Sequence, residues 1–382
     1  MIRKKFGEKI SALANNVLRN LVSRSDAEPS GAVSRGAWNT YNGIRRRLAK
    51  RSYSPTDTIV LFFASLMRPQ SVKRAISNSA SSKSGGAGKR YSIIAFSDHH
   101  GNLGEQMAWG DYWLKHELIA AMRRRDGIVV APDMNPDAVI HCFGHFQDLP
   151  PAKEHILWIH SHPEKISPRL LKMYDRVCCI SKPFCAKIEA MGTPCEWVPI
   201  PSAKTLRAGN GGFCGRDAVV FVGNARMPEC HRKIVDDMLE VLRRNPKINF
   251  KIWGQHYKDL PPGVWQGEYF DNADLGDLYV EAAIVLSDHH SDMAAEGFLN
   301  PRILDVAASG GFVISDKNSA IDDYFGASVS QYDGTADGLE ALVLKYLGDH
   351  SARAAFSQLA QAATARFTYD AVAEKLNGKI KT

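Results

Sequence analysis

An α/β protein with two parallel-sheet domains is the fold that this sequence predicts, and three observations lead to it. From Tyr91 onward, short apolar runs alternate with helical stretches. Such alternation is typical of strands that run parallel and are joined by helices. A second series of the same kind begins at Ala218, and Pro199 and Pro201 stand between the two series as a hinge would. Each series therefore predicts one Rossmann-like domain.

The elements of the first domain, residues 90–203, follow from its apolar runs and turn residues. Each run of four to six apolar residues is short enough for a buried strand, and Gly, Pro or polar clusters separate the runs. The expected strands are 91–96, 128–131, 138–143, 156–159, 176–180 and 196–200. The expected helices are 109–125, 166–173 and 183–191.

The second domain, residues 216–382, opens with a strand at 218–223, a helix that ends near 244 and a strand at 248–254. Later in this domain, a helix is defined by the residues at its two ends. Asn300 is a preferred N-cap, and Pro301 fits the first helical position. Gly310 then ends the helix, and the apolar run 312–315 predicts a buried strand.

The start of this helix is a candidate anion site. Arg302 and Asp305 are three residues apart and share a face, while the free N–H groups and the helix dipole favour negative charge. Asp305 would then accept hydrogen bonds from sugar hydroxyls. The alternative is an ordinary capped helix with a solvated ion pair.

A resemblance to a known family supports the first interpretation. The pattern G-F-x-x-x-R-x-x-D-x-x-A-x-G-G-x-V-I-S-D at 297–316, followed by IDDYFG at 321–326, resembles group-1 glycosyltransferases of the two-Rossmann (GT-B) type. It is most similar to their spore-maturation-protein-like branch. The resemblance is specific over about 270–330 and looser from 90 to 270. It implies two Rossmann-like domains facing each other, with the acceptor on the first and a nucleotide-sugar donor on the second.

Carried over residue by residue, the resemblance implies a donor site. Asp305 would bind the nucleotide ribose and Arg302 the diphosphate, beside Asn300. The commoner family pattern has two glutamates eight positions apart, whereas Glu296 and Asp305 are nine apart. Relatives also carry a glycine and nearby cations after the first strand of this domain. The corresponding candidates are Gly223, Arg226 and Arg232.

Three residues after strands of the first domain are catalytic candidates. His160 lies where retaining relatives place a histidine that contacts the donor sugar, although a structural histidine is the alternative. Asp98 and His99 would contact the acceptor, and an Asp–His couple would act as a general base if the enzyme inverts. Neither a helical i,i+4 His pair nor a Cys partner at metal spacing appears, so no metal is predicted.

The charge of the chain is divided unevenly. The net charge is +7, but residues 1–90 hold 18 Lys and Arg against 4 Asp and Glu. Residues 1–89 are therefore interpreted as a basic extension ending in a linker rich in Ser and Gly, and helical spacing of apolar residues over 5–22 predicts an amphipathic helix. This segment would contact an anionic membrane surface, or it would be solvated or disordered. Nucleic acid is not predicted, because no recognition motif accompanies the charge.

Seven cysteines without paired spacing favour a reducing, cytoplasmic compartment. The basic extension adds the expectation of peripheral contact with the inner face of the membrane. No long apolar run or secretory signal is present in the sequence. The sequence thus predicts a glycosyltransferase that moves a sugar from a nucleotide-sugar to an acceptor hydroxyl, in surface glycan or polysaccharide synthesis. Retention of configuration and independence of metal or other cofactors are expected. The alternatives are a sugar-nucleotide epimerase or hydrolase of the same fold, and a non-catalytic binding module.

Overall fold

The structure, a computed structural model, describes residues 89–100, 106–107, 109–125, 127–202, 212–225, 232–257 and 259–378. Apart from Lys89, the predicted basic extension and its amphipathic helix lie outside the described residues, and so does Arg226. Within the described ranges, no helix is long and apolar enough to cross a bilayer.

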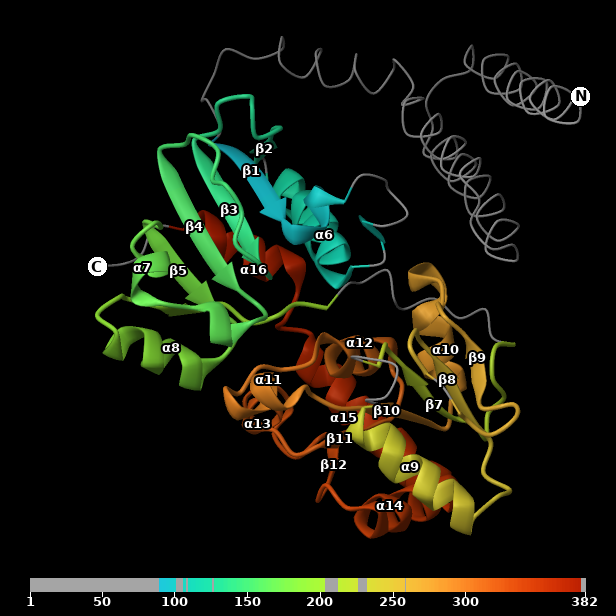
Figure 1. Cartoon of the computed structure of the whole chain (residues 1–382). Coiled ribbons are helices and arrows are strands. Elements are labelled where there is room, and N and C mark those ends of the chain that lie inside the picture. Colours follow the sequence, from blue (N-terminus) through green and yellow to red (C-terminus); the bar gives the residue numbers. More distant parts are fainter. Residues whose placement is uncertain are drawn as a thin grey trace, which may run out of the picture. The chain divides into compact units, whose positions relative to one another are not determined.

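The first sheet has six parallel strands in the order β2-β1-β3-β4-β5-β6. Three inner strands, β1, β3 and β4, have six residues each, and every residue of β3 is buried. The strands, shown in Figure 1, are β1 (Arg90–Ala95), β2 (Ile128–Val129), β3 (Ala138–Phe143), β4 (Glu154–Ile159), β5 (Arg176–Cys179) and β6 (Glu196–Trp197).

The helices of this part agree with the prediction except in one place. They are η1 (Phe96–His99), α6 (Gly110–Arg124), η2 (Pro163–Lys165), α7 (Pro168–Leu171) and α8 (Lys182–Ala190). A single helix was expected over 166–173, but the helix there, α7, is shorter: Ser167 caps it and Pro168 begins it, while the separate turn η2 precedes it. Strand β6 is also shorter than predicted, because Pro199 and Pro201 follow it and lack the N–H that a ladder needs.

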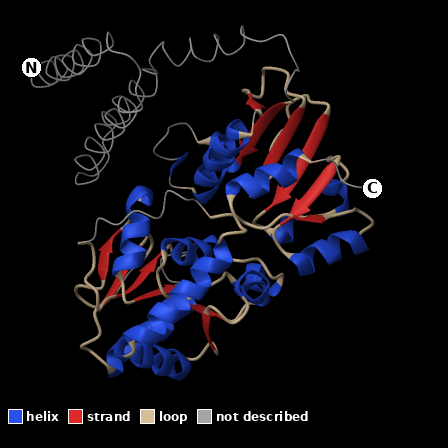
Figure 2. Cartoon of the chain, turned by 180° about the vertical axis from the view of Figure 1, so that it is seen from behind, coloured by secondary structure: helices blue, strands red, loops and turns tan. Residues whose placement is uncertain are grey.

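The second sheet also has six parallel strands, in the order β12-β11-β10-β7-β8-β9. They are β7 (Val219–Val222), β8 (Phe250–Trp253), β9 (Trp265–Gly267), β10 (Ile284–Ser287), β11 (Val313–Asp316) and β12 (Ser330–Tyr332). The helices are α9 (Lys233–Arg244), η4 (Asn272–Asp274), α10 (Leu275–Glu281), α11 (Ser291–Ala295), α12 (Pro301–Ser309), α13 (Ser319–Phe325), α14 (Ala336–Gly348) and α15 (His350–Thr364). Figure 2 shows the strands of each sheet flanked by helices. The predicted α/β fold with two Rossmann-like sheets is confirmed.

The last helix, α16 (Tyr369–Asn377), does not pack with the sheet that precedes it. It packs against α6, beside the first sheet (Figure 1). Arg176 of β5 donates to the carbonyl of Leu376 at 3.0 Å, and Arg124 of α6 pairs with Asp370 at 2.9 Å. The chain therefore returns to the first Rossmann-like unit at its end, which the sequence prediction of a second domain running to residue 382 did not anticipate.

Candidate functional site

Each sheet has a point at which the strand order reverses, and open α/β sheets bind ligands at such points, beyond the carboxyl ends of the strands. In the second sheet the reversal lies between β7 and β10, and in the first between β1 and β3. The residues that follow β7 begin with Gly223, and those that follow β10 begin with Asp288. Most of the predicted donor-binding residues within the described ranges come together at this second point.

The start of α12 is fixed to the loop after β10 by a single side chain. The Oδ1 atom of Asn300 accepts a hydrogen bond from the backbone N–H of Arg302 at 3.1 Å, which confirms the predicted N-cap. Its Nδ2 atom donates to the carbonyl of Asp288 at 2.6 Å. One buried face of the helix holds Ile303 and Leu304 in the core. Asn300 thereby holds the first turn of α12 at the end of β10.

Arg302 lies over the end of β7 in a place that only glycine leaves open. A Cβ atom at Gly223 would stand 2.6 Å from Nη2 of Arg302, and the guanidinium lies 5.0 Å from the ring centre of Phe221. Its Nη1 atom is buried and has no hydrogen-bond partner, while the side chain also forms a hydrogen bond with Tyr279. Burial lowers the pKa of Arg302, as does the nearby charge of Arg232. Packing over Gly223 and Phe221 thus contributes to the position of this side chain.

A second arginine stands beside the first. Nη2 of Arg232 donates to the carbonyl of Asp288 at 2.8 Å and pairs with the Oδ1 atom of Asp288 at 2.5 Å. Its guanidinium lies 5.9 Å from the ring centre of Phe221, the same ring that supports Arg302. Burial raises the pKa of Asp288, while the two arginines act against that rise. Two guanidinium groups therefore share one ring and face one carboxylate that Arg232 has already engaged.

Asp305 occupies the next turn of α12 and lies partly exposed. Its charge contributes to raising the pKa of two buried tyrosines, Tyr279 of α10 and Tyr369 of α16. In both cases burial is the larger cause. Arg302 acts on the pKa of Tyr279 in the opposite direction, through its charge and a hydrogen bond, so both side chains of α12 influence the same tyrosine of α10.

Glu296 is placed differently from the other donor candidates. Its Oε2 atom lies 2.6 Å from Nζ of Lys187, and its carbonyl accepts a hydrogen bond from Oγ of Ser181 at 2.5 Å. Both partners belong to α8 and its N-cap, beside the first sheet. Gly297 follows with φ of 65°, a conformation that favours glycine. Glu296 thus joins the segment before α12 to α8 rather than lying beside Arg302.

The sequence analysis missed a buried Asp–His pair at the same edge. Nδ1 of His289 lies 2.6 Å from Oδ1 of Asp316, and the backbone N–H of His289 donates to Oδ2 of the same carboxylate at 3.1 Å. The Nε2 atom of His289 is buried without a partner. His289 follows β10 and Asp316 is the last residue of β11, and these two strands are neighbours in the sheet. Only the pairing of these strands could reveal this contact.

His160 stands at the carboxyl end of β4, in the first sheet. Burial lowers its pKa to about 4, although the carboxylate of Asp111 and a hydrogen bond to the carbonyl of Cys142 act in the opposite direction. The imidazole is therefore neutral near pH 7, and its Nε2 atom is buried without a partner. Asp111 is itself buried and accepts the N–H of Ser97 at 3.1 Å. It is a neighbour of His160 that the sequence did not reveal.

The other two catalytic candidates lie in η1, after β1. Asp98 accepts the backbone N–H of Ala95 at 3.0 Å through Oδ2, and its Oδ1 atom pairs with Lys115. Both oxygens of Asp98 thus have partners that hold the 3-10 turn. His99 is exposed and lies 6.0 Å from Phe96 between ring centres.

Aromatic and imidazole rings gather at the strand-order reversal of the first sheet. Phe96 stacks on His145 at 4.1 Å between ring centres, so the loops after β1 and β3 touch. His100 stacks on Trp109 at 5.0 Å, and Trp109 meets the edge of Phe96 at 5.1 Å. His162 lies 4.7 Å from His145. Trp109 is 40% exposed, so this cluster offers an aromatic face to solvent.

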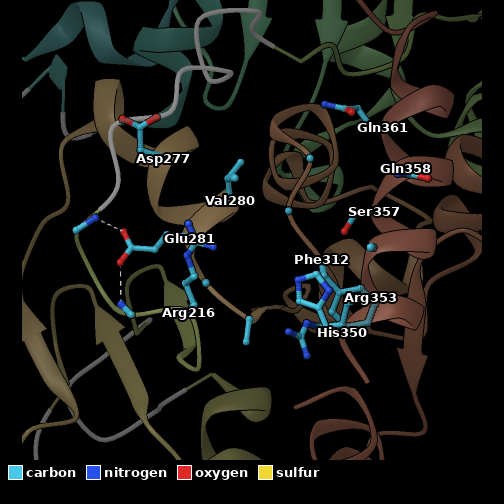
Figure 3. Close-up of a pocket in the computed structure, with 17 residues that line it drawn as sticks. Arg216, Asp277, Val280, Glu281, Phe312, His350, Arg353, Ser357, Gln358 and Gln361 are labelled. Carbon is cyan, nitrogen blue, oxygen red and sulfur yellow. Dashed lines mark hydrogen bonds between the residues drawn. The ribbon is translucent and has the colours of Figure 1, made fainter. Parts of the chain in front are cut away.

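A large cavity lies elsewhere, at the opposite edge of the second sheet, where β7, β10 and β11 begin. Its volume is about 710 Å³, and Figure 3 shows Arg216 and Arg353 approaching it from opposite sides. Glu281 accepts the backbone N–H of Gly212 at 2.6 Å and that of Gly215 at 2.8 Å, with two more N–H groups between them. The protein's own carboxylate thus fills this row of donors. The cavity is separate from the edge where Arg302 lies.

No group of three His, Cys, Asp or Glu side chains in the described part of the chain has the arrangement of a metal site. The two carboxylates nearest to the arginine pair already have partners, since Asp288 pairs with Arg232 and Asp316 with His289. The side chains at the strand-order reversal of the second sheet are therefore suited to an anion rather than to a cation.

Comparison with known proteins agrees with this geometry. Residues 232–378, which include the arginine site except Phe221 and Gly223, match the family model described as "Glycosyl transferase-like". Among curated proteins, none matches this sequence.

Several solved structures share the fold across both sheets. A glycosyltransferase involved in avilamycin A biosynthesis has 16% identity and a TM-score of 0.52, with 75% of this chain and 96% of that chain covered. The sucrose-phosphate synthase of Thermosynechococcus elongatus has 10% identity and a TM-score of 0.56, with 76% and 97% covered. An Anabaena protein in complex with UDP and glucose has 11% identity and a TM-score of 0.51, with 76% and 98% covered. At these identities the likeness shows the fold, and together with the family match it supports a group-1 glycosyltransferase, the enzyme class that the sequence predicted.

Proposed function

We propose that this protein transfers a sugar from a nucleotide-sugar donor to an acceptor hydroxyl, with the donor diphosphate beside Arg302 and Arg232. The observation that carries the proposal is the seat of Arg302. The guanidinium is packed against Gly223 and Phe221, its Nη1 atom is buried without a hydrogen-bond partner, and it stands at the strand-order reversal. A cation held in this way favours a multiply charged anion.

The proposed chemistry follows from where charge develops. As the bond between the sugar and the diphosphate breaks, negative charge grows on the leaving oxygens. Arg302, Arg232 and the positive end of the α12 dipole would meet that charge, so the reaction would need no metal. The N–H groups of the first turn do not take part, because Pro301 has none and those of Arg302 and Ile303 bond Asn300. Asp305, on the same helix, would accept hydrogen bonds from the ribose hydroxyls. Asn300 positions both elements by joining α12 to β10.

The first sheet would supply the acceptor side and the contact with the sugar. A neutral His160 can accept or donate one hydrogen bond without attracting the diphosphate, which suits contact with a sugar hydroxyl. The exposed ring of Trp109 and its neighbours suit the apolar face of a glycan acceptor. Both oxygens of Asp98 have partners, so it is not placed as a free base, and this arrangement favours retention of configuration. Synthesis of a surface glycan or polysaccharide is the corresponding role.

The experiment that tests this function separates transfer from its two alternatives. Thermal shift with nucleoside diphosphates and their sugars, beginning with UDP and UDP-glucose, identifies the donor, because a ligand stabilises the folded state by RT ln(1+[L]/Kd). Turnover of the bound donor is then measured with and without glycan acceptors. Product formation only with an acceptor supports transfer. Turnover without any acceptor would indicate an epimerase or hydrolase, and binding without turnover would indicate a binding module.

The basic extension supports a second part of the proposal, namely peripheral contact with the inner face of an anionic membrane. Its support is the charge balance of residues 1–90. Full-length protein should co-sediment with liposomes containing phosphatidylserine at low salt and lose this binding at high salt, because exposed charges are screened beyond about 10 Å at 0.1 M salt. Protein lacking residues 1–89 should not co-sediment, and equal behaviour of the two forms would exclude the membrane role.

A further inference from the structure

Two cysteine sulfurs are in contact beside the first sheet. Sγ of Cys195 lies 3.2 Å from Sγ of Cys185. Cys185 is on α8, and Cys195 lies directly before β6. Because β6 pairs with β5, the loop that carries Cys195 is drawn against the helix that follows β5. The contact is therefore fixed by regular structure on both sides.

The two thiols differ in access and in acidity. Cys185 is buried, whereas Cys195 is partly exposed. Hydrogen bonds with Cys179, the larger cause, and with Cys195 lower the pKa of the Cys185 thiol, while the bond to Cys185 raises the pKa of Cys195. Cys178 and Cys179 are fully buried within β5, as predicted for small apolar residues of a strand. Cys185 is thus the more acidic partner, and Cys195 is the one that a reagent can reach.

We propose that Cys185 and Cys195 form a reversible disulfide when the protein meets a low-molecular-weight disulfide such as oxidised glutathione. The sulfur of Cys195 attacks the reagent disulfide, forms a mixed disulfide and releases one reduced thiol. The sulfur of Cys185 then attacks Cys195 and releases the second. Two protein thiols lose their protons, the reagent gains two electrons and both protons, and one S–S bond replaces another.

The geometry requires little movement for this step. A disulfide has an S–S distance of about 2.05 Å, so the sulfurs must approach by roughly 1 Å, which a small rotation of either side chain supplies. Helix α8, which carries Cys185, also carries Lys187 and has Ser181 as its N-cap, and both of these residues hold Glu296. The disulfide therefore forms next to the contact between the two Rossmann-like units. The proposal does not depend on the activity proposed above.

The test is alkylation of the full chain after treatment with oxidised glutathione or with dithiothreitol, followed by intact and peptide mass spectrometry. The reduced protein should accept seven alkyl groups under denaturing conditions, one for each cysteine. The oxidised protein should accept two fewer, without a glutathione adduct, and a peptide pair should link Cys185 to Cys195. Dithiothreitol should restore both sites.

Two variants distinguish the partners. Cys185→Ser should leave Cys195 as a stable mixed disulfide with glutathione, whereas Cys195→Ser should leave the buried Cys185 unmodified. Cys214→Ser, a buried cysteine that bonds only its neighbouring carbonyl, is the matched control and should still form the bond. Seven alkylated sites after oxidation, or a bridge between any other pair such as Cys179 and Cys185, would overturn the proposal.

Discussion

The carboxyl edges of the two sheets are built on the same strand pattern but carry opposite chemistry. At the edge of the second sheet, Arg302 and Arg232 share the ring of Phe221, and Arg232 engages the one carboxylate between them. At the edge of the first, burial keeps His160 neutral, and aromatic and imidazole rings gather after β1 and β3. One edge is therefore suited to a diphosphate and the other to uncharged, hydroxyl-bearing groups.

The difference teaches how two copies of one architecture can be specialised. Parallel strands bring their carboxyl ends to the same edge regardless of sequence, so the side chains directly after the strands decide what each edge binds. In the second sheet, glycine at 223 lets a guanidinium approach the backbone. In the first, Phe96 follows β1 directly, and its ring stacks on His145 from the loop after β3. Substitutions at each edge test this contrast.

Removing the buried cation should have the greatest effect. For Arg302→Ala we expect kcat to fall by about 10²–10³, the usual effect of losing one donor that stabilises a developing charge. Donor affinity should fall less, because the partner gains charge as the sugar bond breaks. Steady-state kinetics with saturating donor measures both. Arg244→Ala, which removes an arginine from an exposed ion-pair cluster, is the matched control and should leave kcat unchanged.

Neutralising the aspartate of the same helix should act on binding instead. Asp305→Asn keeps the shape but weakens hydrogen bonds to the ribose, and losing a charged bond costs roughly 1.5–3 kcal/mol, so donor Kd should rise about tenfold to a hundredfold. Calorimetric titration with the nucleoside diphosphate gives the Kd. The variant should fold normally, since Asp305 is not part of the buried face of α12. A folded variant with unchanged affinity would place the ribose elsewhere.

Filling the space under Arg302 should have an intermediate effect. In Gly223→Ala the new methyl group would stand 2.6 Å from Nη2 of Arg302 and 3.2 Å from the Phe221 ring, so the guanidinium must move. We expect donor affinity to fall roughly tenfold, the loss of about one charged hydrogen bond. Gly348→Ala, where no atom lies within 4 Å of the new methyl group, is the control. If both variants bind the donor equally, the diphosphate does not lie beside Arg302.

The neutral edge should make the protein sensitive to acid. Burial lowers the pKa of His160 and that of His141 to about 4, below the value of about 6.5 expected in the unfolded chain. Between pH 6.5 and 4 the unfolded state therefore binds protons that the folded state does not. The unfolding free energy should therefore fall as the pH is lowered through this window, by about 1.4 kcal/mol per pH unit for each histidine.

Urea denaturation at several pH values checks this expectation. His160→Asn should reduce the slope of unfolding free energy against pH by about the contribution of one histidine. His350→Asn, at an exposed position, should leave the slope unchanged. An unchanged slope in His160→Asn would mean that His160 takes up its proton as readily in the folded state as in the unfolded state.

The smallest effect is expected from chelation. If Arg302 and Arg232 meet the charge of the leaving diphosphate, turnover should be the same with and without EDTA. The comparison is made with donor and acceptor at fixed, saturating concentrations. A loss of turnover that Mg²⁺ or Mn²⁺ restores would contradict the proposed role of the arginines and return attention to Asp288 and to the pair of His289 and Asp316.

Much of the fold could be predicted because local rules define its elements. The N-cap at Asn300, the proline after it and the stop at Gly310 define α12 to the residue. Alternation of apolar runs gave the inner strands β3 and β4 within two residues, because buried strands need continuous apolar sequence. Prediction was weaker at 166–173 and 196–200, where prolines shorten the elements.

The candidate site was predictable only in part. Arg302, Asp305 and Asn300 share one short helix, so sequence spacing alone places them together. The pairs of Asp288 with Arg232 and of His289 with Asp316 join residues that are far apart in the chain, and they form because β7, β10 and β11 are neighbours in the sheet. The position of Glu296 against Lys187 likewise depends on packing between elements of the two sheets.

The sequence by itself determined the repeated α/β pattern, the capped helix with its arginine and aspartate, and the charge asymmetry of the chain. Each of these depends on neighbouring residues, where backbone preferences and side-chain spacing act directly. The tertiary structure decided that Arg302 is buried over Gly223, that His160 is neutral, and that α16 returns to the first sheet. Burial and long-range pairing set these properties, because the loss of solvent around a charge depends on every element that covers it.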